Sequence, residues 1–205
     1  VVTPFCDGGE LFSTVKSSDG LPESEARILF HQILEGTAYL HSLNVAHRDI
    51  SIENVLLHQG SCLVMDFGMA VRLPDNGVTR PLGRCGKPNY MAPEILKNRE
   101  SLDARSSDVW SLGILLFILL SGIPPVEVAM ASDPRFRYIA AGHLRQLVRQ
   151  WRLGISPLAQ DLLFVMLKAD WRDRPTTEEL LAHPWFLQME EGPEDGEGEE
   201  DEEEG

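Results

Sequence analysis

The sequence predicts a mainly α-helical fold with a few short β-strands. Residues 22–43 place apolar side chains at helical spacing on one face. Residues 108–120 are almost continuously apolar, which indicates a buried helix. Two short β-prone runs, residues 54–57 and 61–65, are joined by a turn that contains glycine. We therefore expect helices to form most of the fold and a small hairpin to stand at its edge.

The first segment, residues 1–12, is predicted to be the end of an apolar strand that passes through a turn into a short helix. Gly8 and Gly9 break the regular structure between the two, and an ordinary turn is the alternative interpretation. The sequence opens inside the apolar run without an initiator Met, so we expect it to be a piece of a longer protein.

The next segment has the signals of a long helix. Pro22 suits the first helical turn, where its missing N–H would have no helical partner. Glu23 and Glu25 suit the positive end of the helix dipole, and Asn44 is expected to follow the end of the helix. The apolar face consists of Ala26, Leu29, Phe30, Ile33, Leu34 and Leu40.

Polar side chains flank the predicted hairpin on both sides. Asp49 and Asn54 lie at or before its start and Asp66 follows it, so the three side chains can converge on one edge of a small sheet. Phosphoryl transfer with bound Mg²⁺ needs such a set, because one carboxylate orients the hydroxyl nucleophile while an amide and a second carboxylate hold the metal. The sequence therefore predicts a phosphoryl-transfer site at this edge.

The second half of the chain is predicted to be helical as well. The apolar helix 108–120 ends at the helix-breaking residues 121–125. Residues 156–167 and 176–182 are the clearest helices that follow, because Ser156 and Thr176 are good N-cap residues.

The formal net charge of −14 is concentrated at one end of the chain. Residues 190–205 contain 11 acidic and no basic residues, which leaves 21 acidic against 18 basic residues in the rest. The body therefore has no overall basic field, and no nucleic-acid binding is predicted. Residues 188–205 are predicted to be a disordered acidic tail, because this composition buries too little apolar surface to fold. Such a tail is usually solvated, and binding to a basic partner is the alternative.

The cysteines and the apolar runs predict the compartment. Cys6, Cys62 and Cys85 are few, far apart and not spaced as metal ligands, which predicts reduced thiols in a cytoplasmic protein, with the nucleus as the alternative. The most apolar run, residues 112–120, is too short to span a bilayer, so no membrane contact is predicted.

Three ordered motifs give the chain a resemblance to a known family. They are His47-Arg48-Asp49 with Asn54 five residues later, Asp66-Phe67-Gly68 and Ala92-Pro93-Glu94. This set is similar to the signature of eukaryotic protein kinases of the serine/threonine type. The resemblance covers residues 1–187 and implies a partial kinase domain, namely the hinge and the protein-kinase-like C-terminal lobe. It also implies ATP, Mg²⁺ and protein substrates with Ser or Thr acceptors.

The resemblance assigns roles to residues of the predicted site. Asp49 would be the catalytic base, and Asn54 and Asp66 would be the Mg²⁺ ligands. His47 and Phe67 would be internal packing groups of a hydrophobic spine.

Three further residues would contact the nucleotide. Cys6 falls at the hinge position whose backbone bonds adenine, and Leu56 falls at the floor under the adenine. Glu10 falls where a carboxylate meets the ribose or a basic residue of the substrate.

The chain departs from the family pattern at two positions. The family usually has Lys two residues after the catalytic Asp and Thr before the Tyr-x-Ala-Pro-Glu segment, whereas this chain has Ser51 and Lys87 there. We expect an exchange in which Lys87 supplies the cation near the γ-phosphate and Ser51 supplies the hydroxyl, because a flexible Lys stem can reach the same point from the other side. Loss of activity toward a pseudokinase is the alternative, and the intact base and metal ligands favour the exchange.

The resemblance also implies structural pairings. Asp108 should hydrogen-bond the backbone of the catalytic loop, and Arg174 should pair with Glu94 in a largely buried bridge. Arg48 should pair with a phosphate on the segment after Asp66-Phe67-Gly68. Thr79 is the candidate acceptor, and an unmodified loop threonine is an equally good interpretation.

The family's small-lobe motifs are not found in this sequence. It contains neither a G-x-G-x-x-G loop nor a V-A-I-K lysine, so we expect this fragment alone to bind ATP poorly and to be inactive. Two interpretations stay open. One is a serine/threonine kinase whose small lobe lies upstream, and the other is a non-catalytic large-lobe module that binds proteins.

Overall fold

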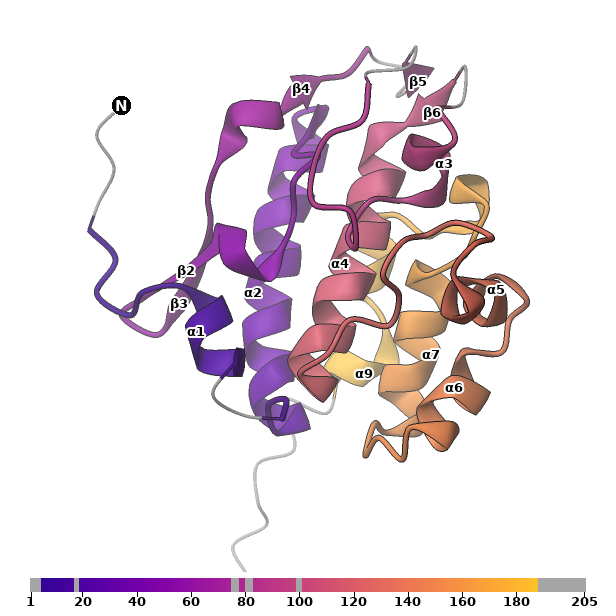
Figure 1. Cartoon of the computed structure of the whole chain (residues 1–205). Coiled ribbons are helices and arrows are strands. Elements are labelled where there is room, and N and C mark those ends of the chain that lie inside the picture. The colour runs from indigo at the N-terminus through magenta and orange to yellow at the C-terminus, as the bar shows by residue number, and fades with distance from the viewer. Residues whose placement is uncertain (1–4, 17–18, 75–77, 80–82, 99–100, 188–205) are drawn as a thin grey trace, which may run out of the picture.

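The structure is a computed structural model, and it describes residues 5–16, 19–74, 78–79, 83–98 and 101–187 (Figure 1). The predicted acidic tail, residues 188–205, lies outside the described residues, as does the side chain of Thr79. The helices are α1 Leu11–Lys16, α2 Glu23–Ser42, α3 Pro93–Leu96, α4 Ala104–Ser121, α5 Pro134–Ala140, α6 Leu144–Gln150, α7 Pro157–Met166, α8 Thr177–Leu181 and α9 Pro184–Leu187. The strands are β1 Val45–Ala46, β2 Val55–His58, β3 Ser61–Val64, β4 Val71–Arg72, β5 Val78–Thr79 and β6 Leu102–Asp103. The 3₁₀ turns are η1 Ile52–Asn54, η2 Phe67–Met69 and η3 Trp171–Asp173.

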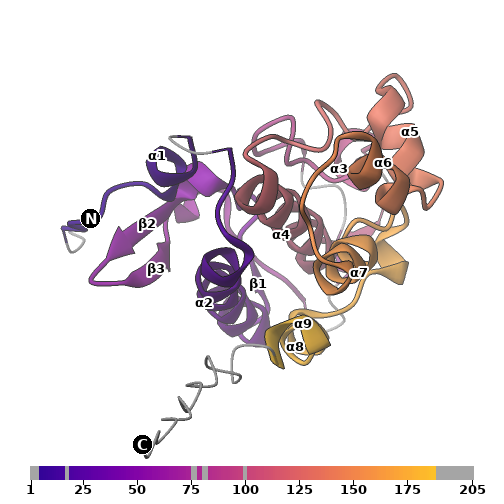
Figure 2. The ribbon, with the colours of Figure 1, turned by 90° about the horizontal axis from the view of Figure 1, so that it is seen from below.

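Two long helices, α2 and α4, lie side by side at the centre of the molecule (Figure 1). α8 packs on α2, α7 packs on α4, and α9 packs on α7. The strands form antiparallel pairs, β1 with β4, β2 with β3 and β5 with β6. Figure 2 shows the β2–β3 hairpin and the α5–α6 pair at opposite ends of the molecule. The predicted fold class, mainly α with a few short strands, is confirmed.

The predicted helix 22–43 is α2. Its first turn carries Glu23 and Glu25, and Asn44 follows the helix in the left-handed conformation with φ 56°. Its buried face contains Ala26, Phe30, Ile33, Leu34, Thr37, Ala38 and His41. Four of the six predicted apolar residues, Ala26, Phe30, Ile33 and Leu34, lie on this face, whereas Leu29 and Leu40 are half-buried. The shared helical spacing directs the buried face toward α4 and α8.

The core helix α4 is longer than the apolar run that predicted it. Asp103 caps it by accepting a hydrogen bond from Arg105 N at 2.9 Å, and Gly122 ends it with φ 73°. Gly113 allows close packing on α7, because a Cβ there would lie 2.9 Å from Leu167 Cδ2. Within the described part of the chain α4 alone has the length and composition of a membrane span, but 78% of it is buried, as is usual for a core helix.

The predicted hairpin is β2–β3, with Val55 paired to Val64 and His58 to Ser61. Gln59 and Gly60 both have positive φ, which suits the two-residue turns that match strand twist. The hairpin begins one residue later than predicted, because Asn54 belongs to η1.

The predicted caps Ser156 and Thr176 are both present. Ser156 Oγ accepts from Ala159 N at 3.2 Å. Thr176 and Glu179 form a reciprocal capping box at the start of α8.

Glu23 has a contact that its place in the first turn of α2 did not predict. Its Oε1 accepts hydrogen bonds from Ser156 Oγ at 2.6 Å and from Trp185 Nε1 at 2.8 Å. Burial alone would raise the pKa of Glu23, but these donors lower it more. One carboxylate therefore joins α2 to the start of α7 and to α9.

Candidate active site

The loop between β1 and η1, residues 47–51, is anchored to the core helix. The Asp108 carboxylate on α4 is 1% exposed and accepts from His47 N and from Arg48 N, both at 2.8 Å. Arg48 has φ 68°, a conformation that costs free energy in a residue other than glycine. The buried carboxylate offsets that cost and holds the loop in one shape, as predicted for Asp108.

His41 extends this anchor, a contact that was not predicted. His41 Nε2 lies 3.0 Å from Asp108 Oδ2, and His41 Nδ1 lies 3.3 Å from Thr177 Oγ1. All three residues are buried. Because they lie on α2, α4 and α8, the loop is coupled to three helices. His41 and Thr177 are 136 positions apart, so no local pattern could have indicated the contact.

Asp49 is held by Asn54, as the convergence argument requires. Asn54 Nδ2 donates to the backbone carbonyl of Asp49 at 2.8 Å and to Asp49 Oδ2 at 2.9 Å. The other oxygen, Asp49 Oδ1, is buried and accepts no hydrogen bond within the described residues. A buried carboxylate oxygen without a donor is rare in native proteins, and a catalytic role is one explanation for it.

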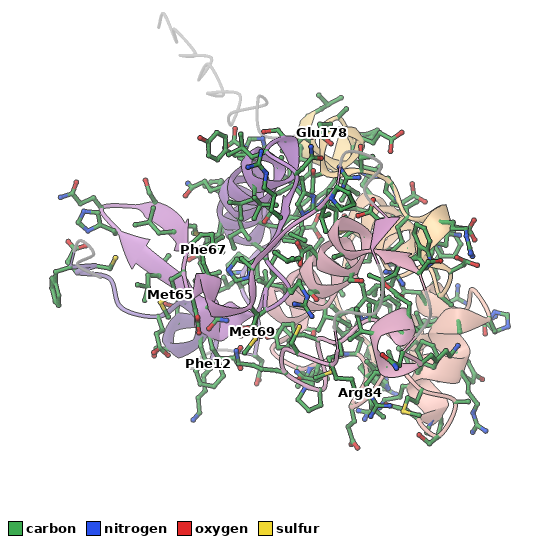
Figure 3. All side chains as sticks on the ribbon, turned by 90° about the horizontal axis from the view of Figure 1, so that it is seen from above. Phe12, Met65, Phe67, Met69, Arg84 and Glu178 are labelled. Atoms are coloured by element: carbon green, nitrogen blue, oxygen red, sulfur yellow. The ribbon has the colours of Figure 1, made fainter. Side chains whose placement is uncertain are left out.

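Asp66 follows a residue whose backbone is bonded to the loop and to η1. Met65 N donates to the Asn54 carbonyl at 2.9 Å, and the Met65 carbonyl lies 3.1 Å from His47 Nε2. Asp66 itself is left-handed, with φ 64°, and its Oδ1 accepts from Gly68 N at 3.1 Å. Figure 3 shows Met65, Phe67 and Met69 along this turn.

His47 is buried between two parts of the site. Its Nδ1 lies 3.3 Å from Asp49 N and its Nε2 faces the Met65 carbonyl, so the ring accepts on one side and donates on the other. His47 thereby joins the loop that carries Asp49 to the strand that precedes Asp66. The prediction of an internal His47 is confirmed, since it is 0% exposed.

Phe67 corrects a prediction. It was expected to be an internal packing group, but it is 51% exposed. One side of its ring contacts His47 at a centroid distance of 5.1 Å. The other side is open because Phe67 lies on η2 at the edge of the lobe, where no described element covers it.

The donor set suits magnesium more than a transition metal. Asn54 uses its amide nitrogen on Asp49, which leaves its carbonyl oxygen for another contact, and Asp66 contributes an exposed carboxylate. Mg²⁺ is commonly held by one or two such oxygens together with phosphates and waters. Among the described residues no group of three or more His, Cys, Asp or Glu side chains could hold a metal by itself. The two residues therefore fit an ion that arrives with a phosphate ligand.

Ser51 and Lys87 contact each other, as the exchange requires. Lys87 Nζ donates to Ser51 Oγ at 2.8 Å and lies 3.8 Å from Asp49 Oδ2. Ser51 is 0% exposed, whereas the Lys87 side chain is 34% exposed. Lys87 comes from the segment that follows η2, so its ammonium reaches the base from a part of the chain 36 residues after Ser51.

The hinge segment pairs with the hairpin. Gly8 N donates to the Leu57 carbonyl and Leu57 N donates to the Gly9 carbonyl, both at 2.9 Å, and Glu10 forms a bridge to Leu56. The predicted nucleotide contacts Glu10 and Leu56 are therefore neighbours, with Glu10 exposed and Leu56 half-buried. Cys6 is half-buried on the same segment.

Arg48 binds backbone groups in this structure. Its Nη1 donates to the Met69 carbonyl at 3.3 Å and its Nη2 to the Gly83 carbonyl at 3.2 Å. Arg48 thus joins the two ends of the segment that contains Thr79. Cys85 lies beside it, and burial raises the pKa of the Cys85 thiol despite the nearby guanidinium.

The segment before Ala92-Pro93-Glu94 packs on the loop through Tyr90. Tyr90 is 3% exposed, and its hydroxyl accepts from Ile52 N at 3.3 Å. Burial raises the pKa of Tyr90, and the Glu53 carboxylate raises it further. Tyr90 therefore stays neutral and links the two segments, a role that the sequence did not predict.

The predicted bridge between Glu94 and Arg174 is present. Arg174 Nη1 and Nη2 donate to the two Glu94 oxygens at 2.7 and 2.8 Å. Ser107 Oγ donates to Glu94 Oε1 at 2.8 Å. Arg84 of the preceding segment, labelled in Figure 3, donates to the Leu96 carbonyl at 2.6 Å. These bonds fix the end of the segment that carries Lys87.

Comparison with known proteins agrees with this geometry. The family model described as "Protein kinase domain" matches residues 1–186. The chain is 36% identical over 201 residues to a probable serine/threonine-protein kinase, fhkD, of Dictyostelium discoideum, with 91% of the chain and 26% of that protein covered. It is 36% identical over 188 residues to the serine/threonine-protein kinase chk1 of Schizosaccharomyces pombe, with 91% and 37% covered.

A relative of closer length is the testis-specific serine/threonine-protein kinase 3 of Mus musculus. It is 35% identical over 186 residues, with 91% of the chain and 67% of the mouse protein covered. The chain spans 26% to 37% of the length of the other two relatives. The likeness therefore concerns one part of those longer proteins.

Proposed function

The chain belongs to the protein kinase family, and on this premise we propose that it is the catalytic lobe of an ATP-dependent serine/threonine protein kinase. The reaction moves the γ-phosphoryl group of ATP to a Ser or Thr hydroxyl of a protein substrate. The observation that carries the proposal is the hydrogen-bonded frame in which Asn54 holds the Asp49 carboxylate next to the strand that leads to Asp66.

Asp49 is the proposed base. The substrate hydroxyl donates its proton to a carboxylate oxygen of Asp49 as the oxygen attacks phosphorus, and Asn54 keeps that carboxylate from turning away. A positioned proton acceptor contributes roughly 10² to 10⁴ in rate. Asn54 and Asp66 would hold Mg²⁺, which neutralises phosphate charge when bound.

The proposal extends to the nucleotide and to the rest of the chain. Cys6, Glu10 and Leu56 would contact the adenine and ribose, because the hinge segment pairs with β2 directly beside the loop. We assign residues 1–187 to the kinase lobe and residues 188–205 to an acidic segment with affinity for a basic surface. We also propose that the protein is cytoplasmic.

Lys87 is the proposed cation near the γ-phosphate, with Ser51 as its hydroxyl partner. The support is the 2.8 Å hydrogen bond between them and the 3.8 Å approach of Lys87 Nζ to Asp49 Oδ2. A Lys at position 51 and a Thr at position 87 would reproduce the same pair with the two residue types exchanged.

The test is phosphate transfer by the longest form of the protein that its gene encodes. We expect Lys87→Thr to lower kcat by about 100-fold, the effect of losing one preorganised charge at a transition state. The double variant Lys87→Thr/Ser51→Lys should have a kcat at least about tenfold higher than that of Lys87→Thr, which is half of the loss on a logarithmic scale. Lys97→Thr, an exposed lysine beyond α3, is the matched control and should change kcat by less than about twofold.

Three results would contradict the proposal. Unchanged transfer by Lys87→Thr would remove the role of Lys87, and a double variant as impaired as the single one would refute the exchange. If the parent binds no ATP in the presence of Mg²⁺, the second candidate, a protein-binding pseudokinase, is favoured; the departure at Ser51 and Lys87 is the observation behind it. A glycine-rich loop and a strand lysine in the upstream reading frame would favour the enzyme.

A further inference from the structure

One stretch of the chain outside the loop 47–51 carries positive charge and no negative charge. Residues 134–160 contain five arginines and no acidic residue, in a chain whose net charge is −14. Arg145 and Arg149 are four residues apart on α6, so they lie on one face of the helix, and Arg152 follows two residues after the helix ends. All three are exposed. We call this set the α6 arginine stripe.

The surroundings neutralise one of the three arginines of the stripe. Arg145 forms an ion pair with Asp161 at 3.2 Å, in which both side chains are largely exposed. Arg149 and Arg152 form no ion pair within the described residues. Like charges four residues apart on a helix repel each other, so the stripe retains positive charge that an acidic partner would stabilise. The opposite face of α6, with Leu144, Leu147 and Val148, is buried, so only the arginine face is available.

We propose that the acidic segment of the same chain, residues 199–204, docks on the α6 arginine stripe. These residues are Glu199-Glu200-Asp201-Glu202-Glu203-Glu204, six consecutive acidic side chains. The charges are complementary. The segment has no apolar side chain, so the contact is electrostatic and it weakens with salt. This inference identifies the basic surface in the proposed function, but it does not depend on phosphate transfer.

The acidic segment can reach the stripe. The described chain ends with α9, and α7 contacts both α9 and α6. Two helix-packing distances, about 20 Å, together with the length of the ten-residue helix α7, about 15 Å, set an upper bound on the separation of α9 from α6. Residues 188–198 can span up to roughly 36 Å when extended. A short connection of this kind gives a tethered segment an effective concentration on the order of millimolar, enough for a weak contact to be largely formed.

The experiment measures a competition between the tethered segment and the same segment in solution. The probe is a fluorescein-labelled peptide of residues 188–205, whose anisotropy is followed on titration with the full-length chain. One receptor is the parent, and the other is a neutralised variant in which residues 199–204 are changed by Glu→Gln and Asp201→Asn. The peptide should bind the neutralised variant at least about tenfold more tightly than the parent, because the parental segment occupies the stripe.

The stripe is then tested in the neutralised variant. Arg149→Glu/Arg152→Glu should weaken peptide binding at least about tenfold, and Arg149→Gln/Arg152→Gln should weaken it to a smaller extent. The matched control, Lys16→Glu/Lys97→Glu, makes the same charge change at two exposed lysines on other elements and should change the affinity by less than about twofold. Raising NaCl from about 0.05 to 0.5 M should weaken binding at least about tenfold.

Several outcomes would overturn the proposal. Equal affinity of the peptide for the parent and the neutralised variant would mean that the tethered segment does not occupy the stripe. An equal loss in the lysine control would mean that binding follows net charge and has no defined surface. A parental dimer in sedimentation that dissociates on neutralisation would assign the contact to a second copy of the chain. If the parent transfers no phosphate but the peptide still binds the neutralised variant more tightly than the parent, the proposed function is refuted and the docking of the acidic segment is not.

Discussion

The buried bridge between Glu94 and Arg174 allows a quantitative prediction about stability. The Arg174 side chain is 0% exposed and the Glu94 side chain is 2% exposed. Arg174→Met removes both charged hydrogen bonds to Glu94 and leaves Ser107 as the donor to that carboxylate among the described residues. Breaking one partner of a buried pair costs about 3–5 kcal/mol, because a buried charge remains uncompensated.

The size of the effect can be converted into measured quantities. For a domain of this length, 1 kcal/mol corresponds to roughly 2–4 °C in Tm, so Arg174→Met should lower Tm by about 6–20 °C. Urea unfolding of the full chain, followed by tryptophan fluorescence, gives the free energy of unfolding from the midpoint and the slope. The matched control is Arg172→Met, since the Arg172 side chain is 57% exposed and pairs with Asp170 at the surface. That control should change the free energy by less than about 0.5 kcal/mol.

A second variant separates the orphaned charge from the lost packing. If the uncompensated carboxylate causes the loss, Glu94→Gln/Arg174→Met should be more stable than Arg174→Met by at least about 1 kcal/mol. If Arg174→Met and Arg172→Met unfold at the same urea concentration, the buried pair of Glu94 and Arg174 does not stabilise the fold as expected. If the double variant is no more stable than the single one, the loss comes from packing and not from the uncompensated carboxylate.

Three further predictions concern local interactions. Thr176→Ala removes the capping box with Glu179 and should lower the free energy of unfolding by about 1 kcal/mol in the same urea assay, whereas Thr176→Asn should retain most of it. Gly113→Ala places a methyl group 2.9 Å from Leu167 Cδ2 and should cost about 1–3 kcal/mol, and an unchanged midpoint would mean that α7 yields freely. Burial alone would raise the pKa of Asp133, but backbone N–H donors lower it more, so its stabilising effect is present above the unfolded pKa near 3.8 and is lost as pH falls below it. Urea titrations from pH 6 to about pH 3 should therefore show a smaller loss for Asp133→Asn than for the parent.

Local rules accounted for most of the secondary structure. The 3.6-residue periodicity predicted most of the buried face of α2, and the turn that contains Gly60 predicted the β2–β3 hairpin. Ser156 and Thr176 were recognised as caps because a cap needs only a few neighbouring residues. The boundaries shifted by one residue at β2, where Asn54 joined a 3₁₀ turn, since its side chain holds Asp49.

Other features depended on contacts that no local pattern encodes. The bond between His41 and Asp108, the double role of Glu23 between α7 and α9, and the exposure of Phe67 were not predicted. Each depends on which helices pack together. The pairing of Glu94 with Arg174 was predicted only through the resemblance, because 80 positions separate the two residues.

Sequence patterns alone predicted a mainly helical fold, the positions of the longest helix and of the hairpin, and the acidic and amide groups suited to a phosphate. These properties depend on neighbouring residues, whose spacing is written in the chain. The folded chain was needed to show that His41 bonds Asp108 and that Phe67 is exposed, and it turns the expected contact of Lys87 with Ser51 beside Asp49 into an observed one. Such contacts form when α2, α4 and the segment that carries Lys87 pack around a common core. Packing brings together residues that are far apart in the sequence, and no local pattern can predict those pairs.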